Sequence, residues 1–187
     1  MTNHRTLGRL DTDDALSEPD LLAEPVAATL VALAEAGMPL PASVAPIDPD
    51  LADTAAFCAA YDVPLEASAN CVVVAGRRDG ELRVAACMVL ATTRTDVNTT
   101  VRKRLGVRKA SFLPMDDAVA MTGMEYGGIT PIGLPADWPV LVDSAVAELP
   151  AAVIGSGLRR SKMVVTGQAL ASLPTAEVIE GLGRPVG

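Results

Sequence analysis

The feature that most constrains the fold is a pair of β-rich runs, residues 71–75 and 82–90, on either side of Asp79-Gly80. An Asp-Gly step between two apolar runs is a strong signal for a tight turn between antiparallel strands. The sequence therefore predicts a β-hairpin in the first half of the chain.

Further short elements are expected around this hairpin. Residues 140–142, 151–154 and 163–166 have the composition of short strands. Capping residues and apolar spacing predict single helices between the strands. These helices are expected at residues 25–37 (in a helical region that starts near Ser17), within 50–61, and at 96–106, 116–122 and 175–182. Strands interrupted by single helices, without regular βαβ alternation, favour the α+β class with a mixed sheet.

The N-terminal region differs in charge from the rest. Residues 1–53 hold ten acidic and two basic side chains, which accounts for the whole net charge of −8. The remaining residues are neutral overall, so an RNA partner is compatible with the body of the chain. We expect a mobile tail over residues 1–17 and a Pro-rich extended connector over residues 38–49. Residues 1–45 are interpreted as an extension, and 46–187 as one domain.

Membrane insertion is not expected, because every apolar run is interrupted well before the roughly 20 residues that a span needs. The N-terminus turns acidic where a signal peptide would be apolar. A cytoplasmic location is therefore expected.

Several chemistries are excluded by residue type. The only histidine, His4, lies in the expected tail, so the body cannot build a histidine-based triad or metal site. Gly155-Ser156-Gly157 lacks the spacing of a nucleophile elbow, and no phosphate-loop or dinucleotide fingerprint occurs. The three cysteines are interpreted as small buried hydrophobes, not as disulfide or zinc ligands. Neither a metal nor a cofactor is expected.

Two basic clusters remain. The first is Arg102, Lys103, Arg104, Arg108 and Lys109, for which a solvated helix face is favoured. The second is Arg159, Arg160 and Lys162, directly after the Gly-Ser-Gly turn. Exposed amides and arginines of that kind can hold a phosphate, and a solvated surface is an equally good interpretation.

The most unusual segment is residues 126–139, with three Gly and three Pro. A run that overlaps this segment, Gly123-Met-Glu-Tyr-Gly-Gly-Ile-Thr-Pro-Ile-Gly-Leu-Pro135, followed by Pro139-Val-Leu-Val-Asp143, resembles the signature loop and strand of the YbaK/prolyl-tRNA synthetase-associated editing family. The flanks agree in order: Asn70-Cys-Val-Val-Val, Arg94 with Asp96, and Gly155-Ser156-Gly157 with Arg159-Arg160 are similar to family features. The resemblance covers about residues 50–172.

This resemblance implies a mixed, barrel-like sheet surrounded by short helices. It also implies aminoacyl-tRNA editing in trans, the hydrolysis of the ester between a wrongly attached small amino acid and the terminal ribose of tRNA. The implied partner is the aminoacyl-tRNA acceptor end, and neither DNA nor a membrane is implied. The implied catalytic residues are Asn70, Gly127, Gly128 and Thr130. The implied substrate-binding residues are Pro131, Gly133, Asp143, Ser156, Gly157 and Arg159.

The sequence departs from the family at two positions. Asn70 stands where the family has a lysine, and Met163 where many members have an acidic residue. An amide supplies hydrogen bonds but no positive charge, so weakened catalysis is one expectation. The alternative is a non-catalytic module that binds tRNA 3′ ends, nucleotides or amino acids. A third possibility is a vestigial pocket, with the acidic extension mediating protein association.

Overall fold

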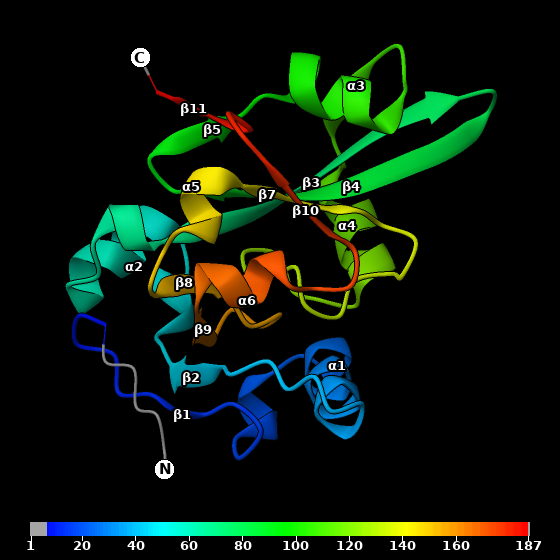
Figure 1. Ribbon diagram of the computed structural model, residues 1–187. Helices are drawn as coiled ribbons and strands as arrows, with labels where there is room; N and C mark the ends of the chain where they lie inside the picture. The colour runs from blue at the N-terminus through cyan, green and yellow to red at the C-terminus, as the bar shows by residue number, and fades with distance from the viewer. Residues whose placement is uncertain (1–6, 187) are drawn as a thin grey trace.

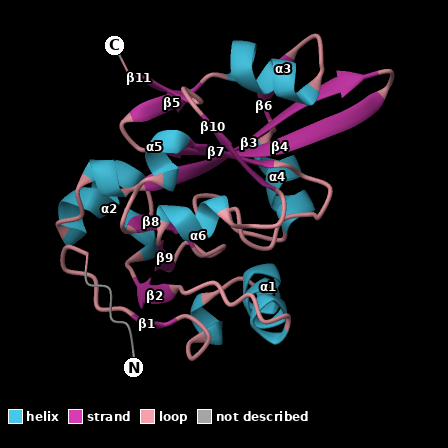
Figure 2. Cartoon of the chain, in the orientation of Figure 1, coloured by secondary structure: helices cyan, strands magenta, loops and turns pink. Residues whose placement is uncertain are grey.

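The computed structural model describes residues 7–186 of the chain, and His4 lies outside them. Strands form three sheets, and short helices lie around them (Figures 1 and 2). The larger sheet occupies the upper half of Figure 1 and the four-stranded sheet the lower half. This arrangement confirms the α+β class with a mixed sheet, although the sheets do not close into one barrel.

The predicted hairpin forms the centre of the larger sheet. Strands β3 (Ala69–Arg78) and β4 (Glu81–Leu90) pair antiparallel along their whole length. Asp79 and Gly80 form the turn with φ of 54° and 84°, a conformation that Asp tolerates and Gly adopts freely. The sheet is completed by β6 (Ala110–Phe112), β7 (Val140–Asp143) and β10 (Ala176–Ile179) in the order β10-β7-β4-β3-β6. Because β7 pairs parallel with β4 and β10, the sheet is mixed.

The four-stranded sheet is antiparallel throughout, in the order β1-β2-β9-β8. Its strands are β1 (Asp13–Asp14), β2 (Ser43–Pro46), β8 (Ala152–Gly155) and β9 (Ser161–Val165). A parallel bridge between Ser68 and Val153 joins it to the start of β3. The two sheets therefore meet where β3 begins and β8 runs beside it, and the site lies at this junction.

The helices largely follow the expected pattern. Asp96 accepts a hydrogen bond from the Thr99 amide and opens the π-helical turn Val97–Val101, and the following helix α3 (Arg102–Leu105) ends at Gly106 with φ of 65°. Helix α4 (Met115–Thr122) ends at Gly123 as predicted. The other helices are α1 (Glu24–Glu35), α2 (Thr54–Tyr61), α5 (Ser144–Ala147) and α6 (Gly167–Ala171), with 3-10 turns at Pro19–Leu21, Pro49–Leu51 and Leu65–Ala67.

The N-terminal region is part of the packed structure. Leu10 and Ala15 are buried, β1 pairs with β2, and Arg9 donates its amide to the Tyr61 carbonyl over 2.8 Å. The predicted mobile tail is therefore wrong for residues 7–17. The connector at 38–49 also differs from the expectation, because its second half pairs with β9 as a strand. Helix α1 adds Val26 and Leu30 to the main hydrophobic core.

The C-terminal prediction is also wrong. Residues 175–182 do not form a helix: β10 lies there, parallel to β7. The chain then forms β11 (Gly183–Pro185), which pairs with β5 (Thr93–Thr95). Backbone pairing with a buried strand overrides the local helix signal of Thr175. No helix within residues 7–186 is long and apolar enough to cross a membrane.

Candidate active site

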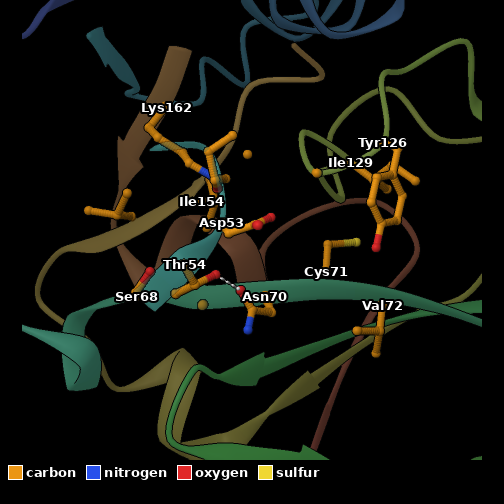
Figure 3. Close-up of a pocket in the computed structure, with 15 residues that line it drawn as sticks. Asp53, Thr54, Ser68, Asn70, Cys71, Val72, Tyr126, Ile129, Ile154 and Lys162 are labelled. Atoms are coloured by element: carbon orange, nitrogen blue, oxygen red, sulfur yellow. Dashed lines mark hydrogen bonds between the residues drawn. The ribbon is translucent and has the colours of Figure 1, made fainter. Parts of the chain in front are cut away.

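A cavity of about 280 Å³ opens at the junction of the two sheets. The start of β3, the N-terminus of α2, the signature loop and strands β8 and β9 all contribute to its wall. Figure 3 shows this arrangement, with residues far apart in the sequence turned toward one space. Its lining side chains include Asp53, Thr54, Ser68, Asn70, Cys71, Val72, Tyr126, Ile129, Val153, Ile154 and Lys162.

Asn70 lies in this cavity, as the resemblance implies. Its side-chain oxygen accepts a hydrogen bond of 2.8 Å from the Thr54 hydroxyl (Figure 3). This bond fixes the amide, and its nitrogen has no hydrogen-bond partner within residues 7–186. Asn70 is therefore a neutral donor, positioned by the first residue of α2.

Lys162 places a cation in the same cavity. It stands on β9 next to Met163, is 8% exposed, and donates from Nζ to the Ala52 carbonyl over 3.1 Å. Nζ also lies 5.5 Å from the centroid of the Phe57 ring. Burial lowers the pKa of Lys162, as does the nearby Arg159 charge, while Cys58 and Asp53 act in the opposite direction. A buried lysine with a perturbed pKa in a cavity is a functional-site candidate.

The signature loop contributes Gly127 to the wall. Gly127 adopts φ of 81°, and its N–H has no hydrogen-bond partner within the described residues. Gly128 is used structurally, since its carbonyl accepts from the Gly157 amide over 2.7 Å. A Cβ on Gly155 would overlap the Gly128 carbonyl oxygen. Only glycine therefore lets β8 approach the loop this closely.

The Gly-Ser-Gly turn supports the loop from behind. The Ser156 hydroxyl is fully buried and lies 2.7 Å from the Ser161 hydroxyl. Arg159 holds the loop from the surface, because its guanidinium donates to the carbonyls of Tyr126 and Pro49, each over 3.2 Å. Ser156 and Gly157 are thus packing residues, and Arg159 sits at the rim beside Tyr126.

Four other predicted site residues do not line the cavity. Asp143 is buried at the end of β7, where it caps α5 and accepts from the Gly183 amide. Thr130 is fully buried, and a Cβ on Gly133 would meet the Pro25 backbone of α1. Pro131 also lies outside the cavity wall. The structure brings together Asn70 and Gly127, with Arg159 at the rim.

Sequence reasoning missed most residues of the cavity wall, among them the polar Asp53, Thr54 and, above all, Lys162. In the sequence, Lys162 belongs to the cluster with Arg159 and Arg160, for which phosphate binding and a solvated surface are equally good interpretations. The signal that could have found it is the alternation within β9, which puts Lys162 on the same face as the apolar Val164, a residue that is fully buried.

The cavity thiol is not activated. Burial raises the pKa of Cys71 far above its ordinary value, and the nearby Cys87 adds to the rise. Burial also raises the pKa of Cys87, to about 12. A thiol is nucleophilic only as the thiolate, so Cys71 is an apolar wall residue. Within residues 7–186, no three His, Cys, Asp or Glu side chains are placed to hold a metal ion.

Comparison with known proteins agrees with this geometry. The model of the aminoacyl-tRNA editing domain family matches residues 48–173. The chain therefore belongs to the aminoacyl-tRNA editing domain family.

Solved structures share the fold at low identity. A protein proposed to be a trans-editing enzyme for prolyl-tRNA synthetase has a TM-score of 0.68 at 19% identity, over 85% of this chain and 97% of that one. A hypothetical protein of known structure has a TM-score of 0.69 at 17% identity, over 82% and 97%. A protein solved in work on epitope grafting onto scaffold proteins by computational design has a TM-score of 0.68 at 19% identity, over 88% of this chain and 100% of that one. At these identities the likeness concerns the fold.

Proposed function

We propose that the protein hydrolyses the ester that joins a wrongly attached small amino acid to the terminal ribose of tRNA. The observation that carries this proposal is the position of Lys162, whose ammonium lies in the same cavity as Asn70 and the Gly127 backbone. The family lysine is missing at position 70, and β9 supplies a cation from the opposite wall. The cavity therefore keeps a positive charge, which comes from a different position in the sequence.

Each cavity group has a role in ester hydrolysis. When water attacks the ester carbon, negative charge develops on the carbonyl oxygen, and a positioned donor or cation stabilises it. The free Gly127 N–H and the Asn70 amide nitrogen are the neutral donors. The Lys162 ammonium keeps two N–H groups beyond its bond to Ala52, and these bind either that oxygen or the terminal phosphate. The ribose oxygen leaves with a proton from water.

The wall of the cavity supports a small side chain as the substrate. Its volume of about 280 Å³ lies just below the roughly 300–1,000 Å³ that is typical of ligand pockets. Ile129, Val153 and Ile154 make part of the wall apolar. A large amino acid together with the terminal adenosine would exceed this space.

We also propose that residues 46–187 form the editing unit and that residues 1–45 are an extension, of which the described part, residues 7–45, packs on that unit. The Ala23 amide donates to the Ser156 carbonyl over 3.1 Å. The extension thus supports the turn behind the signature loop.

The test is release of labelled amino acid from tRNAs misacylated with small residues, alanine and cysteine among them, with correctly charged tRNAs as controls. Turnover of at least one misacylated tRNA above the buffer rate is expected. Binding of tRNA ends without turnover of any substrate would instead support the non-catalytic module.

A further inference from the structure

Positive charge is concentrated in one stretch of this acidic protein. Residues 77–109 hold nine basic and three acidic side chains, a net charge of +6 in a chain whose total is −8. All other residues together therefore carry −14. Such segregation is a feature that a phosphate-rich partner can recognise.

The fold gathers these charges on one surface. The Arg78 guanidinium donates to the Gly106 carbonyl over 3.1 Å, and the Arg83 guanidinium to the Leu105 carbonyl over 2.9 Å. These bonds tie the tip of the β3–β4 hairpin to the end of α3, and the two lie together at the upper right of Figure 1. We name this surface the basic face; it comprises Arg77, Arg78, Arg83, Arg102, Lys103, Arg104, Arg108 and Lys109.

The basic face is hollowed and largely uncompensated. A concavity of about 570 Å³ is lined by Arg77, Arg78, Arg102 and Arg108, with Asp79 as its acidic member. Asp79 lies 3.6 Å from Arg78 and is almost fully exposed, so it neutralises little. Arg104 pairs with Glu177 at 2.5 Å. Arg108 and Lys109 are exposed and make no side-chain hydrogen bond or ion pair within residues 7–186.

The distance from the cavity decides what the basic face can touch. Asn70 and Arg78 lie on the same strand, eight residues apart, or roughly 26 Å at the usual strand rise. A terminal adenosine held in the cavity does not reach that far. Phosphates further along the same nucleic acid do.

We propose that the basic face binds the phosphate backbone of the acceptor stem while the cavity holds the tRNA end. This inference rests on the proposed function for the identity of the RNA. Contacts to phosphate carry no sequence information, so the basic face contributes affinity and register, and selection of the amino acid stays with the cavity.

The test measures how tightly the native protein and its variants bind deacylated tRNA at salt concentrations from about 50 mM to about 200 mM. The variant is Arg77→Gln with Arg108→Gln, two exposed residues that do not tie the hairpin to α3. The matched control is Gln168→Glu on α6 with Ser172→Glu at the C-cap of that helix, two exposed positions, and it changes the net charge by the same amount. A second control, Arg77→Lys with Arg108→Lys, keeps the charge.

The neutralised variant is expected to bind tRNA on the order of tenfold more weakly at the lower salt, with the slope of log affinity against log salt reduced by about 1.8. Both controls are expected to keep the native slope. Hydrolysis of a short aminoacylated CCA-end fragment, which does not reach the basic face, is expected to be the same in all four proteins. Binding is measured without turnover, so failure of the editing proposal leaves this test intact.

Equal salt slopes in the native and neutralised proteins would overturn the proposal. So would loss of tRNA binding in the α6 control, because net charge alone would then explain the effect. Binding to anionic lipid vesicles with the same dependence on Arg77 and Arg108, and none to tRNA, would reassign the surface to a membrane.

Discussion

The Thr54 hydroxyl donates to the Asn70 side-chain oxygen over 2.8 Å, and this bond fixes the amide at the position where the resemblance to the editing family places a lysine. A lysine there would bring its own charge. Asn70 instead brings an amide whose oxygen is already occupied and whose nitrogen is left for substrate. Positive charge in the cavity comes from Lys162 on β9.

The cavity cysteine is predicted to be dispensable. Cys71→Ser keeps the shape of the side chain and removes the thiol, and turnover is expected to stay within about twofold of native. The reason is that burial raises the pKa of Cys71, so it stays protonated and is a poor nucleophile at neutral pH. Single-turnover rates on a misacylated tRNA check this. A rate that collapses in Cys71→Ser, with the fold intact, would point to covalent catalysis.

The contact between β8 and the signature loop is predicted to control activity. Gly155→Ala would place a methyl group against the Gly128 carbonyl, costing about 1–3 kcal/mol of stability through overpacking and displacing Gly127. Turnover is expected to fall on the order of 100-fold. Gly37→Ala is the control, because its φ of 74° imposes strain while nothing lies near its Cβ. That variant should lose stability and keep its turnover.

The N-terminal extension is predicted to be structurally required. Leu30 on α1 is 2% exposed and packs in the main core, so Leu30→Ala is expected to cost about 2–5 kcal/mol. Val31 on the same helix is 46% exposed, and Val31→Ala should cost less than about 0.5 kcal/mol. Urea unfolding measures both. Equal, small effects would mean that α1 is only loosely attached to the domain.

Stability is predicted to depend on pH through Lys162. Its pKa in the folded protein lies below the ordinary 10.5 because of burial, so the unfolded chain binds this proton more tightly. The destabilisation is complete below the folded-state pKa and is relieved as the pH rises from that value toward 10.5. The free energy of unfolding of native protein minus that of Lys162→Met should therefore increase as the pH rises above the folded-state pKa toward 10.5. A difference independent of pH would contradict the buried, charged Lys162.

Local chemistry made the hairpin and its neighbours predictable. Asp79-Gly80, Asp96 with Gly106, and Gly123 are turn and cap signals that act within a few residues, and each element formed where they indicate. The failures have a different origin. Residues 176–179 became a strand because β7 offers a buried parallel partner, and Leu10 is buried against segments far along the chain.

The site was predictable only in part, for the same reason. The signature loop and Asn70 were recognisable from a local pattern, and Asn70 and Gly127 do meet in one cavity. Lys162 was not recognisable from a local pattern. Its position in the cavity depends on how β9 pairs with β2 and β8 and on the bridge from Ser68 to Val153. No short motif encodes that long-range arrangement.

The most direct test moves the charge from one wall of the cavity to the other. Hydrolysis of the preferred misacylated tRNA is measured for the native protein, Lys162→Met, and Lys162→Met combined with Asn70→Lys, with circular dichroism to confirm folding. Loss of the cation is expected to lower the rate on the order of 100-fold, and the double variant should recover part of that loss because a cation returns to the cavity. A Lys162→Met protein that folds and turns over at the native rate would contradict the assignment of Lys162 as the site's charge.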